Sequence, residues 1–187
     1  MRKTITLAFA VLLVISSLVS AQDVQVATTL AFAEGPTADA DGNVYFTDQT
    51  NNRIMRLGVD GKLSTFRQPA NYANGMVFDS QWRLLVCESG DPVSGTLPRV
   101  TRTDMKTGQL EVLADGYEGK HFIAPNDITF DGKGRIYFSD KPLVPGITPS
   151  PVPGASEAVS KGGSIALILM ESLRASSLRR RSRCRTV

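Results

Sequence analysis

Residues 39–48 read DADGNVYFTD, and residues 131–140 repeat the phrase as DGKGRIYFSD. In both copies an Asp- and Gly-containing turn precedes β-branched and aromatic residues, which is the pattern of a tight hairpin turn leading into a strand. A weaker copy, DSQWRLLVCE, occupies residues 79–88, with Trp82 where the other copies have glycine and Glu88 as the closing acid. The chain therefore contains a repeated unit.

The spacing of the copies predicts the fold. The aligned residues Asp39, Asp79 and Asp131 are 40 and 52 residues apart, which is close to the length of a four-stranded propeller blade. A β-sandwich or barrel has similar strand spacing, but the same phrase at the same point of each unit favours radial repetition. We therefore expect an all-β fold, a β-propeller in which each blade uses the same hairpin.

Short runs of β-branched and aromatic residues, divided by turn dipeptides such as Asp60-Gly61, predict the individual strands. The predicted strands are 26–29, 44–47, 54–57, 63–66, 76–78, 84–88, 99–104, 110–114, 127–130 and 136–139.

The first 21 residues predict a secretory signal peptide. Arg2 and Lys3 precede a mostly apolar run, and Val19-Ser20-Ala21 fits a small-residue cleavage site. A membrane anchor is the alternative, but the run is shorter than the roughly 20 residues needed to span a bilayer. We expect export to the periplasm or the extracellular space, cleavage near Ala21, and no membrane span afterwards.

The composition changes at residue 141. Every aromatic residue lies at or before Phe138, and half of the ten prolines follow residue 141. We therefore expect residues 22–140 to form a partial propeller and residues 141–187 to form a Pro/Ser/Arg-rich tail outside it. The tail is read either as a natural disordered or weakly helical basic arm or, as we favour, as the product of a frameshift near Asp140.

Charge argues against a nucleic-acid partner. The sequence pI is about 9.0, but six arginines lie within residues 174–185 and the body is acidic. Cys87 lies in a predicted core strand and Cys184 in the tail, so no structural disulfide is expected.

Five residues before each aligned Asp stands an oxygen-bearing side chain, namely Glu34, Asn74 or Asn126. Equivalent positions of a propeller face the same place in every blade, so these groups would converge on the central channel. A carboxylate and two amide oxygens without His or Cys are hard ligands suited to Ca²⁺ or Mg²⁺. The alternatives are a solvated loop acid for Glu34 and turn-forming roles for both asparagines.

The series AEGP, NYANGMVFDSQWRLLVCESG, RVTRTD, YEGK and APNDITFDGKGRIYFSD closely resembles the gluconolactonase family, also called the SMP-30, regucalcin and lactonohydrolase-like group. The resemblance covers roughly residues 30–140. It implies a six-bladed propeller that hydrolyses sugar lactones with a divalent cation in its channel, with Ca²⁺ first and Mg²⁺ or Zn²⁺ as alternatives.

The resemblance also implies roles for particular residues. Glu34 matches a metal ligand, and Asn126 matches a residue that coordinates the metal or holds substrate and water beside it. Asn74 matches a channel-lining, substrate-binding position, and Asp127 a loop-supporting one. His121 is a candidate at the pocket rim, with a surface-loop role as the alternative. The general base comes from later blades in the family, so no catalytic residue is assigned.

About three of six blades are predicted, because the repeat covers only residues 22–140. We therefore expect a weak or inactive sugar lactone hydrolase that is unstable alone or self-associates through open blade edges. One alternative is a non-catalytic Ca²⁺-binding propeller fragment that acts as an interaction module. Another is a basic tail that binds anionic lipid or polymer, with the body as a spacer.

Overall fold

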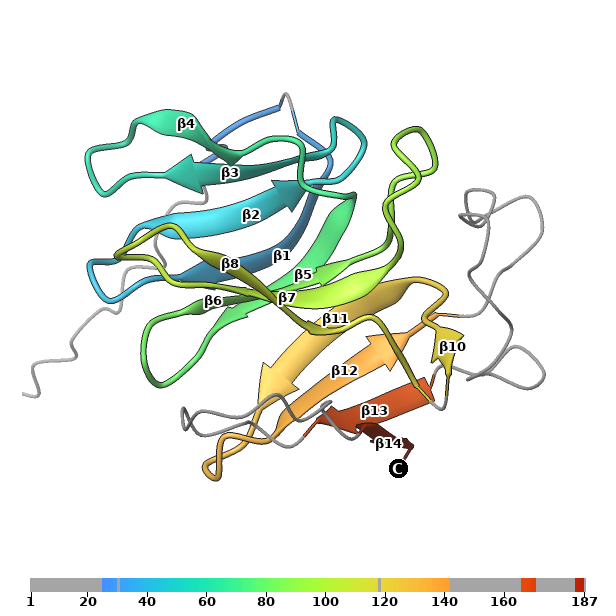
Figure 1. Cartoon of the computed structure of the whole chain (residues 1–187). Helices are drawn as coiled ribbons and strands as arrows, with labels where there is room; N and C mark the ends of the chain where they lie inside the picture. The colour runs from blue at the N-terminus through green and yellow to red at the C-terminus, as the bar shows by residue number, and fades with distance from the viewer. Residues whose placement is uncertain (1–24, 30, 118, 142–165, 171–183, 187) are drawn as a thin grey trace, which may run out of the picture.

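Figure 1 shows the computed structural model, which describes residues 25–29, 31–117, 119–141, 166–170 and 184–186. The predicted signal peptide and most of the predicted tail lie outside these residues. Within the described ranges the chain contains strands, turns and irregular segments and no helix, which confirms the prediction of an all-β fold. It follows that these ranges hold no apolar helix of membrane-spanning length.

Three antiparallel sheets of four strands account for most of the structure. In each sheet the strands follow one another in chain order, so each is a simple meander. The first sheet contains β1 (Ala33–Ala38), β2 (Val44–Asp48), β3 (Arg53–Leu57) and β4 (Leu63–Arg67); the second contains β5 (Ala73–Phe78), β6 (Leu84–Glu88), β7 (Arg99–Thr103) and β8 (Leu110–Ala114); the third contains β11 (Pro125–Phe130), β12 (Ile136–Asp140), β13 (Ala166–Met170) and β14 (Cys184–Thr186). A short hairpin of β9 (Gly116–Tyr117) and β10 (Lys120–His121) joins the second sheet to the third.

The repeated phrase forms the same hairpin in all three sheets, as predicted. The Oδ1 atom of Asp131 accepts hydrogen bonds from the amides of Lys133 (2.9 Å) and Arg135 (3.0 Å). Asp39 and Asp79 make the equivalent pair of bonds in the other two turns. An aspartate that bonds backbone amides two and four residues later stabilises the turn locally. The repeat in the sequence is therefore a repeat of turn chemistry.

The fourth residue of each of these turns has a positive φ. Gly42 (φ 85°) and Gly134 (φ 75°) adopt this conformation without steric conflict, whereas Trp82 (φ 58°) adopts it with a bulky side chain. The Trp82 ring lies 6.3 Å from that of Phe78, between ring centroids, so packing offsets part of the backbone strain.

Each predicted strand except 26–29 corresponds to an observed strand. Residues 26–29 form no strand, and the first strand is instead β1, with the sequence AEGPTA. This segment contains Gly35 and Pro36 and no β-branched residue except Thr37, so local propensity gives no strand signal. Its backbone pairs with β2 because the hairpin turn at Asp39 fixes the register.

Two strands of the third sheet come from the predicted tail. β13 pairs with β12 along its whole length, from Ile136 with Met170 to Asp140 with Ala166, and β14 pairs with β13. This differs from the expectation that no strand of the sheet follows residue 140. The β13 segment, ALILM, is a run of apolar residues that suits a buried strand. Its pairing partner lies far away in sequence, so local patterns do not reveal the pairing. The proposed frameshift stays a prediction.

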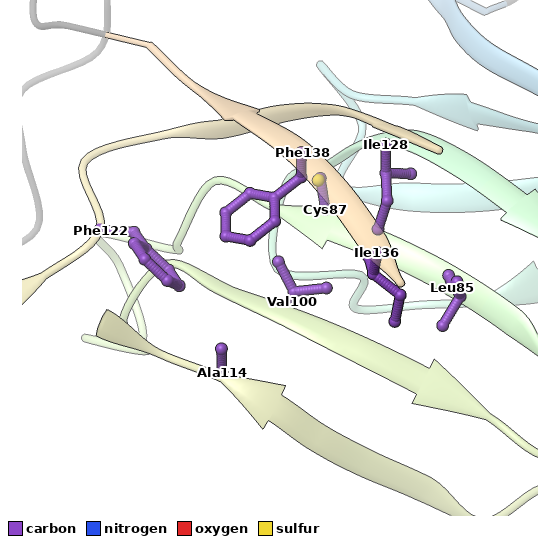
Figure 2. Packing of buried hydrophobic residues seen from close by; sticks show 8 residues of the cluster. All are labelled: Leu85, Cys87, Val100, Ala114, Phe122, Ile128, Ile136 and Phe138. Carbon is purple, nitrogen blue, oxygen red and sulfur yellow. The ribbon is translucent and has the colours of Figure 1, made fainter. Parts of the chain in front are cut away.

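Apolar side chains fill the spaces between neighbouring sheets, and β6 contributes to both spaces. Leu84 and Val86 belong to the cluster between the first and second sheets, while Leu85 and Cys87 belong to the cluster between the second and third. Figure 2 shows the latter cluster, in which Phe122 and Phe138 meet edge to face at 5.1 Å between ring centroids. Because β6 is buried on both faces, its first four residues, Leu84 to Cys87, are apolar without alternation.

A matched pair of valine variants tests this central role of β6. Val86 is fully buried, whereas Val93 is 89% exposed in the loop between β6 and β7. We expect Val86→Ala to lower the free energy of unfolding by about 2 kcal/mol, since it removes buried methyl groups and leaves a cavity. Val93→Ala should change it by less than about 0.5 kcal/mol. Urea denaturation followed by fluorescence measures both, and equal effects would contradict the arrangement.

Candidate functional site

The three candidate ligand residues occupy the same place in their sheets. Glu34, Asn74 and Asn126 are each the second residue of the first strand, in β1, β5 and β11. The register of each first strand shifts at this place, between Glu34 and Thr37 in β1, between Ala73 and Met76 in β5, and between Pro125 and Ile128 in β11. Bulges commonly redirect side chains next to functional sites.

The first strands of neighbouring sheets touch at these positions. A Cβ atom placed on Gly35 would lie 2.5 Å from the carbonyl oxygen of Asn74 and 2.7 Å from the Cα atom of Gly75. A Cβ atom on Gly75 would in turn lie 2.5 Å from the carbonyl oxygen of Asn126. These contacts set β1 beside β5 and β5 beside β11 (Figure 1). Glu34, Asn74 and Asn126 therefore lie on three adjacent first strands, at the equivalent position of each.

The side chains of these three residues are available for a ligand. Glu34 and Asn126 are half-buried and Asn74 is buried, yet within the described part of the chain none of the three side chains makes a hydrogen bond to protein. The buried amide of Asn43, by contrast, is bonded at both of its ends: its nitrogen donates to the Asp39 carboxylate (2.8 Å) and its oxygen accepts from the amide of Val59 (3.2 Å). Both candidate asparagines lie in strands and bond no turn backbone, which argues against the turn-forming alternative.

The other two singled-out residues have local partners. The Nδ1 atom of His121, on β10, lies 3.0 Å from the carbonyl oxygen of Asp115, so its hydrogen bond belongs to the hairpin before the third sheet. Asp127 accepts a bond from the amide of Ile128 (2.9 Å), and its own amide donates to the Ser139 hydroxyl (3.0 Å). This geometry suits the predicted supporting role of Asp127 at the start of β11.

The donor set fits a hard cation better than a soft one. Across the described ranges, His, Cys, Asp and Glu side chains form no group of three or more placed to hold a metal. Cys87 is free and buried, and burial raises the pKa of its thiol well above the usual value, so it offers no thiolate. One carboxylate with amide oxygens matches the ligands of Ca²⁺ and Mg²⁺.

Buried acids lie directly across from the candidate site, and their role was missed in the sequence. Asp48, Glu88 and Asp140 end the second strands and are each at most 1% exposed. Burial raises the pKa of Asp140 to about 6, although its hydrogen bonds from the amides of Ile123 and Ala124 act in the opposite direction. An acid closes every copy of the repeated phrase in the sequence, and this recurrence could have identified the three acids as a set.

The structure is thus that of an all-β repeat protein, in which three four-stranded meanders touch through their first strands and carry an acid or an amide at the same position. The chain belongs to the SMP-30/gluconolactonase/LRE-like family, whose model matches residues 32–165, and the resemblance noted in the sequence is confirmed. Among individual relatives, a gluconolactonase of Zymomonas mobilis is 29% identical over 131 residues, covering 63% of this chain and 35% of the relative.

Solved structures show the same fold. A gluconolactonase from Xanthomonas campestris superposes with a TM-score of 0.58 at 26% identity, covering 73% of this chain and 43% of that protein. A putative gluconolactonase at 22% identity gives a TM-score of 0.56 over 84% of this chain and 63% of the other. The chain thus spans about a third of the curated relative and less than half of the Xanthomonas protein.

Glycine substitution tests the contact between first strands. We expect Gly75→Ala to lower the free energy of unfolding by about 1–3 kcal/mol, because its Cβ atom would meet the backbone of β11. Gly132→Ala is the control, since a Cβ atom there meets nothing within 4 Å. Chemical denaturation of both variants is the measurement, and an unaffected Gly75→Ala would mean that β5 and β11 lie further apart.

The raised pKa of Asp140 predicts a pH dependence of stability. The native carboxyl holds its proton more tightly than the unfolded one, whose pKa is 3.8. Its stabilising contribution is therefore complete below about pH 4 and is lost as the pH rises through about 6, a change of about 3 kcal/mol. We expect the unfolding free energy of the wild type, measured against Asp140→Asn in urea, to fall between pH 4 and 7. A constant difference would contradict the prediction.

Proposed function

We propose that this chain carries the cation-binding part of a gluconolactonase-type site that hydrolyses sugar lactones. One observation carries the proposal: Glu34, Asn74 and Asn126 share one position in three adjacent first strands, and their side chains bond to no protein group in the described ranges. Family membership supports it, as does the name gluconolactonase of the relatives from Zymomonas and Xanthomonas.

In this proposal the three sheets are consecutive blades of a six-bladed β-propeller. Contact between β1 and β5 and between β5 and β11 supports a common axis lined by first strands. Each second strand then lies further from the axis, and the apolar clusters fill the wedges between blades.

Each residue has a distinct task. Glu34 would supply the negative charge that holds a divalent cation, and Asn74 and Asn126 would add neutral oxygen ligands or orient the hydroxyl groups of a sugar lactone. Ca²⁺ suits this set best, Mg²⁺ next, and Zn²⁺ least because it favours nitrogen and sulfur. When bound, such a cation polarises a carbonyl group and lowers the pKa of a coordinated water.

The general base is not assigned to a described residue. The Asp127 carboxylate is the nearest in sequence to Asn126, and it bonds the amide of Ile128. The family resemblance places the base in later blades, so a second candidate function is a cation-binding module without catalysis. The match covers only 35% of the length of the Zymomonas relative, which supports the non-catalytic module as the second candidate. Export and self-association stay predictions.

A pair of charge-matched variants tests the cation site. We expect Ca²⁺ to bind with a dissociation constant of about 10⁻⁴–10⁻³ M, as for weak sites with few charged ligands. Glu34→Gln should weaken binding at least tenfold, whereas Asp41→Asn, which removes the same charge from an exposed turn, should not. Isothermal titration calorimetry measures all three proteins, and equal affinities would overturn the cation site.

The same proteins separate the two functions. Acid release from glucono-1,5-lactone, followed in a pH-stat with and without Ca²⁺, measures hydrolysis. Ca²⁺-dependent hydrolysis that is lost in Glu34→Gln supports the lactonase function. Ca²⁺ binding without hydrolysis supports the non-catalytic module instead.

A further inference from the structure

A buried acid ends the second strand of each four-stranded sheet, directly across from the residue that precedes a candidate ligand. Asp140 pairs with Pro125 in the ladder between β11 and β12, and Asn126 follows Pro125. The other two sheets repeat the arrangement, with Asp48 across from Ala33 and Glu88 across from Ala73. The three acids are thus equivalent by register as well as by sequence.

Within the described residues, the Asp140 carboxylate accepts hydrogen bonds only from the segment that leads into β11. Its Oδ1 atom accepts from the amides of Ile123 (3.1 Å) and Ala124 (2.7 Å), and its Oδ2 atom accepts from Ile123 as well (3.0 Å). These residues immediately precede β11. Among the described residues no Lys or Arg forms an ion pair with Asp140.

Glu88 and Asp48 make the same connection with additional partners. Glu88 accepts from the side chain of Asn71 (3.1 Å), two residues before β5, and also pairs with Arg67 and Arg99. Asp48 accepts from the amide of Phe32 (3.2 Å), one residue before β1, and pairs with Arg53 at 2.8 Å. The donors differ between sheets, but the segment they belong to is always the one before the first strand.

These partners compensate the burial of the three carboxylates, but well-packed apolar residues can often replace buried charged groups without loss of stability. The recurrence of an acid at this position is therefore not explained by stability alone. We infer that Asp48, Glu88 and Asp140 are positioning residues, each of which anchors the segment before the first strand and thereby fixes the ligand side chain that follows. That these side chains bind a cation rests on the proposed function, whereas the anchoring does not.

Asp140 gives the cleanest test, because in the described chain its carboxylate accepts hydrogen bonds only from the amides of Ile123 and Ala124. The readout is amide hydrogen exchange at Asp127 and Ile128, whose amides bond to Ser139 and to the Asp127 carboxylate rather than to Asp140. We expect exchange there to become at least tenfold faster in Asp140→Ala, relative to the amides of β6. Asp140→Asn, which keeps one acceptor, should lie in between.

Ile136→Val is the control, since Ile136 is buried in the same strand and pairs with Phe130 at the opposite end. If Asp140 only supports overall stability, its variants should speed up hydrogen exchange by the same factor at Asp127, at Ile128 and at the amides of β6, as Ile136→Val does. That result would overturn the inference. If Asp140→Ala does not fold, Asp140→Asn is read at the same amides, and Glu88→Gln is read at Gly75 and Met76. Unchanged local exchange in these variants would also overturn it.

Calcium titration of the same variants separates this inference from the proposed function. If Asp140→Ala speeds up exchange selectively at Asp127 and Ile128 but the wild type binds no Ca²⁺, the anchoring is supported and the cation site is rejected. Ca²⁺ binding that depends on Glu34 but is equal in wild type and Asp140→Ala, with uniform exchange, would retain the site and reject the anchoring. Selective acceleration together with at least threefold weaker Ca²⁺ binding supports both.

Discussion

Backbone contact between the first strands constrains the rest of the structure. Gly35 and Gly75 let β1, β5 and β11 approach more closely than any Cβ atom allows. Large side chains such as Phe78 and Phe138 fill the remaining space between neighbouring sheets. The same contact places Glu34, Asn74 and Asn126 side by side. Packing and the candidate site therefore depend on the same two glycines.

Much of this arrangement is readable in the sequence because it is local. The aspartate that opens each turn bonds amides two and four residues later, so turn, strand and register appear together within ten letters. Repetition of that phrase predicts equivalent positions, and counting back from each aspartate finds the three ligand candidates. The second turn is recognisable in the sequence although Trp82 replaces glycine, because this copy keeps Asp79 before the turn and the apolar run after it.

The remainder depends on contacts between distant segments. β1 has no strand propensity and becomes a strand only through pairing with β2. β13 joins the third sheet from a segment that resembles a tail, and its partner β12 is more than 25 residues earlier. The acids that close each copy of the repeated phrase are likewise only partly predictable from the sequence. Their recurrence is visible in the sequence, but their burial and their bonds to the preceding segment are tertiary facts.

The third copy of the repeat departs from the others at the glycine position. Asp127 aligns with Gly35 and Gly75, and its side chain is exposed and bonded to the amide of Ile128. The Asp127 side chain occupies the place that is empty at Gly35 and Gly75, so β11 cannot repeat on its other side the close backbone contact that joins β1 to β5 and β5 to β11. If the proposed propeller continues past β11, its next first strand would stand further away, and the proposed channel would be wider beside Asn126 than beside Asn74. Under the proposed function, that side would offer the space for a sugar ring.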